Sequence, residues 1–247
     1  MEGAAEICPT HFRGLASRAE TLLVTGNCMK IPGDSMAARV ALVTGAASGI
    51  GRARSGLWAA AAARRRRRDY VVAHSGGNGR WVGIRQRTAL ESRCTIEINL
   101  TGSFLTRRAA VPARRRVGGG ALVLIGVVNG TRRVSNLGAT AKAAAKAGPL
   151  PMRRALARDK IWVDSMCPGA IRTAILAGSP PGDAANVRYR VNFPAGAGSR
   201  TGGHVGETQP GAGTGWFLLS DWSSPTKGTE VFVDGAQALI QGRGAGV

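Results

Sequence analysis

A strand that runs into a glycine turn and then a helix is the feature that most constrains this fold. The apolar run 39–43 is typical of a buried strand, the stretch 44–51 is glycine-rich, and alanine-rich helical sequence follows. Glycines at such a turn let the backbone approach a pyrophosphate that rests on the helix N-terminus. The turn therefore predicts a nucleotide site, whose residues are Gly45, Ser48, Gly49, Ile50 and Gly51. A plain turn is the alternative, because the chain has 36 glycines.

Strand-like and helix-like segments alternate along the rest of the chain. Four further segments are typical of strands: 70–73, 121–125, 161–166 and 229–235. Two stretches favour helices: 96–116 and 139–148. This alternation predicts an α/β fold with a doubly wound, Rossmann-like parallel sheet that is covered on both faces.

The chain length suits one domain. With 247 residues, 44% of them hydrophobic, the chain can bury a sizeable core. Met36 stands just before the first predicted strand. We therefore expect the Rossmann-like domain to span 36–247 and residues 1–35 to form an N-terminal extension whose role the sequence does not indicate.

Arginine dominates the charge. Lys plus Arg number 34 against 14 Asp plus Glu, a net charge of +20, and the arginines form runs at 64–68 and 114–116. Such runs could bind nucleic-acid phosphates, and a solvated charge run is the alternative. Because no regular aromatic interleaving and no known nucleic-acid signature accompany the runs, we do not expect a nucleic acid as partner.

The sequence indicates neither a membrane segment nor a metal site. No apolar run approaches the ~20 residues that cross a bilayer, and the N-terminus has no apolar core of the kind that secretory signals carry. The four cysteines and three histidines are scattered without ligand spacing. We expect a cytoplasmic protein without a bound metal.

Four segments, taken in order, carry a family resemblance. They are 41–51, 98–102, 166–173, and 217–221 together with 233–235. In this order they resemble the short-chain dehydrogenase/reductase family over roughly residues 36–240. The resemblance implies an oxidoreductase that transfers a hydride between NAD or NADP and an alcohol or carbonyl substrate. It also implies a homo-oligomer, although the net charge opposes association at low salt.

The resemblance assigns site residues as well. The family uses a tyrosine that exchanges the hydroxyl proton, a lysine four residues later that lowers the tyrosine's pKa, and a serine that orients the oxygen. Asn99 matches the asparagine that supports a proton-relay water in the family. The lysine, which also binds the cofactor, matches Lys142, with Lys146 as the alternative register. The loop formed by Pro168, Gly169, Ile171 and Thr173 would contact the nicotinamide and the phosphates.

The catalytic tyrosine and serine of the family have no counterparts. No Tyr-x-x-x-Lys occurs in the chain, because Gly138 stands four residues before Lys142, and Lys142 stands four before Lys146. The serine position falls on Gly126 or Val127, with Val127 preferred, and neither can hydrogen-bond a substrate through its side chain. We expect an incomplete catalytic centre, in which a partly neutral Lys142 could act as a base.

The nucleotide site also departs from the family pattern. If 70–73 is the second strand, the acidic residue that binds the ribose of NAD is replaced by His74 and Ser75. About 24 residues separate His74 from Asn99, fewer than the ~30 of a βαβ unit. We therefore predict that one strand-helix unit, with the family's Asn-Ala-Gly turn, is absent or shortened. The preference between NAD and NADP stays open.

Three accounts remain open from the sequence. The first, which we favour, is a nucleotide-binding relative with lost or altered catalysis. The second is a basic nucleic-acid-binding protein. The third is that parts of residues 52–95, with 106–160 as a further candidate region, are read from a shifted frame of a GC-rich gene, which would explain both the arginine runs and the missing motifs.

Overall fold

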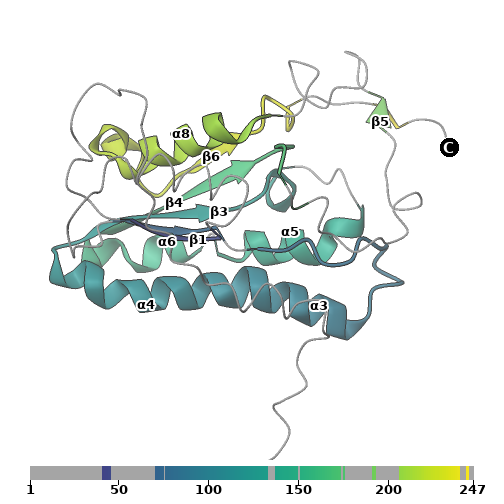
Figure 1. Ribbon diagram of the computed structural model, residues 1–247, viewed down its shortest axis with the longest axis horizontal. Coiled ribbons are helices and arrows are strands. Elements are labelled where there is room, and N and C mark those ends of the chain that lie inside the picture. Colours follow the sequence, from purple (N-terminus) through teal and green to yellow (C-terminus); the bar gives the residue numbers. More distant parts are fainter. Residues whose placement is uncertain are drawn as a thin grey trace, which may run out of the picture.

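A five-stranded parallel sheet forms the centre of the molecule (Figure 1). The computed structural model describes residues 41–45, 70–74, 76–132, 137–149, 151–173, 175, 191–192, 206–239 and 243–244. In spatial order the strands are β1 (Ala41–Thr44), β2 (Tyr70–Ala73), β3 (Gly120–Ile125), β4 (Ile161–Pro168) and β6 (Glu230–Val233). All four pairings between these neighbours are parallel. The predicted α/β class and the parallel sheet are thus confirmed.

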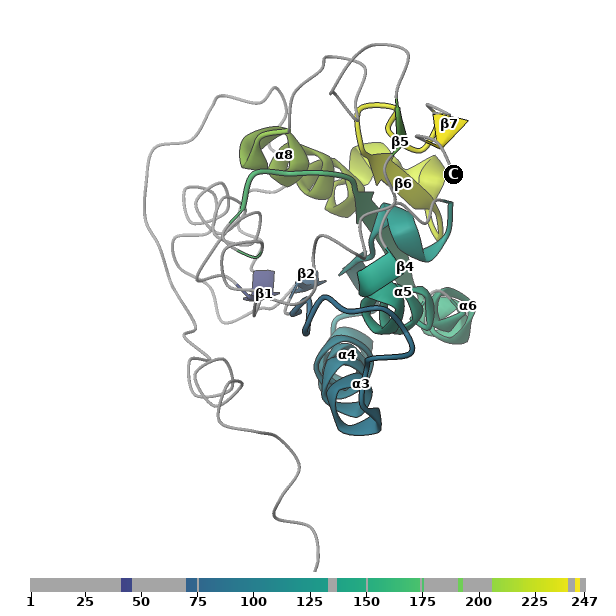
Figure 2. The same ribbon diagram turned by 90° about the vertical axis from the view of Figure 1, so that its right-hand side faces the viewer.

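Helices cover both faces of this sheet (Figure 2). One face carries α3 (Ala89–Ile96), α4 (Gly102–Arg116), α5 (Thr140–Ala147) and α6 (Met152–Ala155), and the other carries α8 (Thr208–Leu219). A π-helical turn, Glu97–Thr101, joins α3 to α4. A separate antiparallel pair consists of β5 (Val191–Asn192) and β7 (Arg243–Gly244). None of the described helices is long and apolar enough to cross a membrane.

The inner strands β2, β3 and β4 contribute side chains to two apolar layers, one on each face of the sheet. Tyr70 and Val72 of β2 belong to the cluster beneath α8, while Val71 and Ala73 belong to the cluster that includes Ala110 of α4. Successive side chains of a strand point to opposite faces, so a strand covered on both sides must be apolar throughout. This explains why β2, β3 and β4 appear as continuous apolar runs in the sequence.

The strand order corrects one sequence-based prediction. In the common order of such sheets, 3-2-1-4-5-6, the second strand lies outside the first and the fourth lies on its other side. Here β2 lies between β1 and β3, with Tyr70 opposite both Ala41 and Ala121. The strand 70–73 therefore takes the fourth place, and the prediction that His74 and Ser75 follow the ribose-binding strand is wrong.

The strand order also places the missing strand-helix unit between β1 and β2, upstream of where the sequence predicted it. Residues 41–73, from the start of β1 to the end of β2, match in length one βαβ unit of ~30 residues. They leave no length for two more strands with their helices. The segment 76–98, where the missing unit was predicted, instead forms a loop and α3. The predicted extension 1–35 and most of the nucleotide turn, residues 46–51, lie outside the described residues.

Candidate functional site

The candidate site lies at the carboxyl ends of the parallel strands. In open α/β sheets ligands bind at this edge, next to the point where the strand order reverses. Gly45 follows β1 with a φ of 71°, a left-handed conformation that favours glycine. The Oγ1 of Thr44 accepts a hydrogen bond from the backbone N–H of His74 at 3.1 Å, which ties the ends of β1 and β2 together. Of the predicted nucleotide turn, only Gly45 is described; Ser48, Gly49, Ile50 and Gly51 are not.

Asn99 holds the loop that follows β2. It lies in the π-helical turn and is fully buried. Its Nδ2 donates to the carbonyl of Gly77 at 3.0 Å and to that of Thr95 at 2.9 Å. Its Oδ1 is buried without a hydrogen-bond partner and faces Gly76, where an added Cβ would lie only 2.7 Å away. The loop can pass this close to Asn99 only because residue 76 is glycine.

Lys142 reaches the same edge from α5. Its Nζ donates to Oδ1 of Asn78 at 2.5 Å, and Nδ2 of Asn78 donates to the carbonyl of Ile175 at 3.1 Å. The loop after β2, helix α5 and the segment beyond β4 therefore meet at one amide. Burial lowers the pKa of Lys142 from 10.5 to about 8.

Lys146 lies one helical turn beyond Lys142 and is more deeply buried, with 6% of its surface exposed. A Cβ on Gly76 would lie 3.0 Å from its Nζ. Burial, then the charges of Lys142 and Arg107, lower the pKa of Lys146 to about 7. Arg107 of α4 is 3% exposed, and burial lowers its pKa to about 10. Three basic groups thus gather between α4 and α5.

The residue that would take the tyrosine's place differs in local structure between the two candidate registers. Gly138, four residues before Lys142, lies in the 3-10 turn Leu137–Ala139 that precedes α5. Its carbonyl accepts a hydrogen bond from Nη2 of Arg87 at 2.7 Å. Lys142 and Lys146, by contrast, are both within α5 and lie on one face. The structure brings Lys146 and Asn99 together at Gly76, with Lys142 one turn away.

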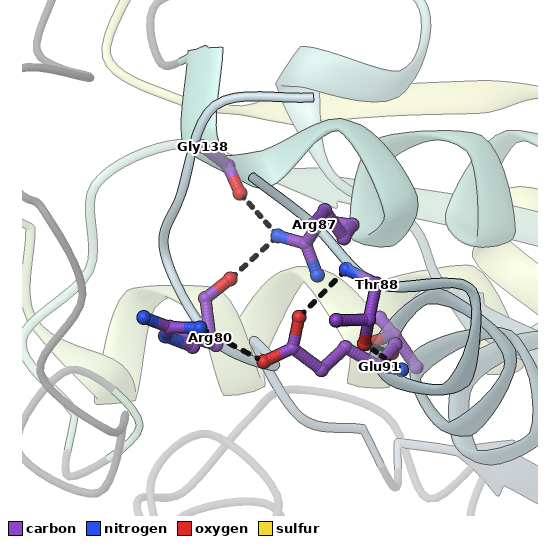
Figure 3. A network of polar contacts seen from close by, with 6 residues as sticks. Arg80, Arg87, Thr88, Glu91 and Gly138 are labelled. Carbon is purple, nitrogen blue, oxygen red and sulfur yellow. Dashed lines mark hydrogen bonds and ion pairs between the residues drawn. The ribbon is translucent and has the colours of Figure 1, made fainter. Parts of the chain in front are cut away.

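A polar network fixes the loop before α3 to the start of α5 (Figure 3). Nη2 of Arg87 donates to the carbonyl of Arg80 at 2.5 Å as well as to that of Gly138. Thr88 and Glu91 form a capping box at the N-terminus of α3, and Glu91 pairs with Arg80 at 3.2 Å. The network holds this loop beside the two lysines.

The loop after β3 also packs on α5. Val127 is extended, with a φ of −158°, and a Cβ on Gly130 would lie 3.6 Å from its Cγ1 and 3.2 Å from the carbonyl of Ala143. The position that the resemblance gives to the catalytic serine is therefore close to the lysine-bearing helix. An apolar side chain stands there.

At the end of β4 the backbone again passes very close to a side chain. A Cβ on Gly169 would lie 2.5 Å from Oε1 of Gln237, and the N–H of Ala170 donates to this same oxygen at 2.9 Å. Ile171 is buried and pairs with Gly206 in an isolated parallel bridge. The structure thus places Pro168, Gly169 and Ile171 at the edge of the sheet; Thr173 follows them in the described chain.

Sequence reasoning missed Asn78, Arg87 and Arg107. The capping box at 88–91 was readable as Thr-x-x-Glu ahead of a helix. Nothing in the local sequence distinguishes Arg107 from the surface arginines, because its contacts are with residues distant in sequence, such as Met152 of α6. Its Nη2 donates to Sδ of Met152 at 2.8 Å.

The arginine run 114–116 does not form a uniform basic surface. Arg114 is 1% exposed, and Arg115 pairs with Asp159 at 2.8 Å. A side chain buried in this way cannot reach a phosphate backbone. The run 64–68 lies outside the described residues.

Comparison with known proteins gives consistent matches. Residues 53–236 match the family described as Enoyl-(Acyl carrier protein) reductase. A curated relative, trans-4-hydroxycyclohexanecarboxylate dehydrogenase of Sinomonas cyclohexanicum, is 34% identical over 151 residues, which are 60% of this chain and 52% of the relative. An uncharacterized short-chain type dehydrogenase/reductase of Sinorhizobium fredii is 28% identical over 58% of this chain and 55% of its own. The chain thus spans about half the length of these curated relatives.

Solved structures match over more of the chain. A 3-ketoacyl-ACP reductase from Sinorhizobium meliloti superposes with a TM-score of 0.72 at 30% identity, covering 81% of this chain and 99% of that one. A 3-ketoacyl-(acyl-carrier-protein) reductase from Brucella melitensis, complexed with NADH, gives a TM-score of 0.69. It is 18% identical and covers 83% of this chain and 100% of its own, a likeness of fold alone.

Proposed function

The chain belongs to the short-chain dehydrogenase/reductase family, and we propose that it binds NAD or NADP and acts on a small alcohol or carbonyl compound through an altered catalytic centre. The observation that carries the proposal is the convergence of Asn99 and Lys146 on Gly76 at the carboxyl edge of the sheet. Family members use nicotinamide nucleotides and place an asparagine and a lysine at their active sites.

The described residues fit such a nucleotide. Gly45 has the positive φ that a tight turn after β1 needs. Gly76 and Gly169 leave no space for a Cβ, so the backbone approaches the site closely at both positions. Gly45, Pro168, Gly169, Ile171 and Thr173 would hold the nucleotide, together with the undescribed Ser48, Gly49, Ile50 and Gly51. When bound, it supplies or accepts a hydride.

We assign Lys146 to the place of the family lysine and Lys142 to that of the tyrosine. The family chemistry requires these two groups one helical turn apart, and Lys142 and Lys146 both lie within α5, whereas Gly138 lies in the 3-10 turn that precedes it. Residues 74–76 then stand where the family has its Asn-Ala-Gly turn, between a strand and the helix that leads to Asn99. This register differs from the sequence-based preference for Lys142 as the family lysine.

In this arrangement Lys142 exchanges a proton with the substrate oxygen. With a pKa of about 8, its ammonium group can donate a proton to a carbonyl oxygen that gains charge, and the amine can take one from an alcohol. Asn78 orients the ammonium group through its Oδ1. Because Val127 offers no hydrogen bond, orienting the substrate oxygen also falls to Lys142. The loss of the serine predicts slow turnover.

The names of relatives suggest which substrates to test first. A cyclic hydroxy acid and a 3-ketoacyl group are the compounds that two relatives' names give, so both belong in the first substrate panel. We also propose a cytoplasmic homo-oligomer, as is common in the family. Light scattering at low and moderate salt would measure the assembly.

Equilibrium titration with NADH and NADPH tests the proposal. We expect saturable binding at moderate salt that excess heparin, a polyanion, does not displace. Binding that heparin abolishes would indicate non-specific attraction by the arginines. That result, or no binding of either nucleotide, would overturn the proposal.

A further inference from the structure

Lysine is rare in this basic chain, and its distribution is uneven. Of the 34 basic residues only five are lysines: Lys30, Lys142, Lys146, Lys160 and Lys227. Two of the five lie one turn apart in α5, at the edge of the sheet where ligands bind. Arginine cannot replace lysine in one respect, because a guanidinium stays protonated whereas a buried amine can lose its proton and become a nucleophile.

The surroundings of this pair favour the neutral amine. The hydrogen-bond acceptor of Lys142 is an amide oxygen, that of Asn78, which carries no charge to hold the proton. The positive charges of Lys142 and Arg107 both lower the pKa of Lys146. Desolvation beside another cation is one of the ways in which proteins activate a lysine amine for attack on a carbonyl.

Lys142 is the more accessible of the two amines. Its side chain is half-buried, whereas Lys146 is buried beneath Gly76 and close to Asn99. Asn78, which binds Lys142, also contacts the carbonyl of Ile175 beyond β4. Lys142 therefore reaches the edge, and Lys146 lies one turn behind it.

We infer that Lys142 is an amine nucleophile that captures small aldehydes and ketones as a Schiff base. This inference rests on the carbonyl site of the proposed function, but it needs no nucleotide. It adds a covalent activity that neither the family resemblance nor the matched relatives imply.

The step balances without an oxidant or reductant. The lone pair of the neutral Nζ forms a bond to the carbonyl carbon, and the C=O π electrons move to oxygen, which takes up a proton. The nitrogen releases a proton, and the hydroxyl group of this carbinolamine is protonated and leaves as water. A protonated C=N bond to Lys142 results. The net reaction joins one amine, one carbonyl compound and one proton and releases one water.

Reductive trapping followed by peptide mapping tests the inference. The full-length protein is incubated at pH 7.5 with butanal or cyclohexanone and sodium cyanoborohydride, which reduces the C=N bond to a stable secondary amine. At this pH a lysine with a pKa near 8 is far more often neutral than one with the ordinary ~10.4. We expect the adduct on Lys142 to exceed that on the exposed Lys160 by about tenfold or more.

Two variants and one parallel measurement make the outcome decisive. Lys142→Arg keeps the charge but removes the amine, so the dominant adduct should disappear, whereas Lys160→Arg should leave it unchanged. Labelling that follows exposure alone, or an adduct mainly on Lys146, would overturn the inference. The wild-type map decides even if Lys142→Arg does not fold. Titration with NADPH on the same sample separates this result from the proposed function: trapping without nucleotide binding refutes only the latter, and binding without trapping refutes only the inference.

Discussion

The side-chain oxygen of Asn78 accepts a hydrogen bond from Nζ of Lys142 at 2.5 Å, across 64 residues of sequence. A neutral amide thus holds an amine for which burial has lowered the pKa to about 8. The other end of the same amide donates to the carbonyl of Ile175. An amide at residue 78, unlike a carboxylate, adds no negative charge that would hold the proton on Lys142.

The variant Asn78→Asp should therefore suppress the reactivity of Lys142. A carboxylate at hydrogen-bond distance favours the ammonium form and raises its pKa by about one unit or more. We expect trapping of butanal at pH 7.5 to fall about tenfold and to recover at higher pH. Adduct yield measured from pH 6.5 to pH 9.5 checks this shift. An unchanged profile would show that the contact does not control the amine.

Restoring the family's groups should produce turnover. In the proposed register, Lys142→Tyr combined with Val127→Ser places a tyrosine one helical turn before Lys146 and a serine after β3. We expect oxidation of NADPH with a 3-ketoacyl substrate to rise at least about tenfold above that of the unchanged protein. The matched control is Gly138→Tyr with Val127→Ser, which should gain nothing, because Gly138 precedes α5 and its carbonyl binds Arg87. Gain in the control alone would favour the other register.

Replacing Lys146 with methionine should stabilise the protein in a pH-dependent way. Lys146 loses its proton near pH 7 when folded but near pH 10.5 when unfolded, so the unfolded chain binds more protons between these values. Wild-type stability therefore rises with pH over this window. We expect Lys146→Met to raise the free energy of unfolding by on the order of a few kcal/mol at pH 7 and by less at pH 9.5. Denaturant titration at both pH values, with Lys160→Met as the exposed control, measures the difference. A gain that does not depend on pH would contradict the burial of a neutral amine.

Glycine 76 should tolerate no side chain. An alanine Cβ would lie 2.7 Å from Oδ1 of Asn99 and 3.0 Å from Nζ of Lys146, so both groups must move. We expect Gly76→Ala to cost about 1–3 kcal/mol of stability and to weaken NADPH binding. Gly213→Ala is the control, because a Cβ in the middle of α8 meets nothing within 4 Å, and alanine there should stabilise by up to about 1 kcal/mol. Equal effects of the two changes on nucleotide binding would argue against a site at Gly76.

The strands were readable from the sequence, but their order was not. Runs such as 70–73 and 121–125 are apolar throughout because both faces of the sheet are covered, and this pattern is local. The sequence-based prediction took 70–73 as the second strand of the family's sheet because it is the second strand along this chain, and this assumes that no strand is missing between it and the first. Only pairing with β1 and β3 reveals the fourth place, since pairing partners lie 29 and 51 residues from Tyr70.

The site could be predicted only in part for a similar reason. Asn99 and both lysines were identifiable from the motifs they resemble, but spacing alone could not choose between two lysines four residues apart. The start of α5 at Thr140 supports one choice, and that boundary depends on tertiary contacts such as the bond from Arg87 to Gly138. Asn78 and Arg107 acquire their roles through contacts distant in sequence, which no local pattern records.

The pairing of β1 with β2 has a consequence for the cohesion of the sheet. Within the described sheet β1 pairs with β2 alone, so it lies at one edge of that sheet, as β6 does at the other. Its last residues, Val43 and Thr44, are half-buried, whereas the core of β3 is fully buried. Strands held on one side open more readily, so amide protons of β1 should exchange with solvent sooner than those of β3. The strand that leads into the nucleotide turn is thus expected to loosen more readily than the inner strands, and a bound nucleotide would slow its exchange.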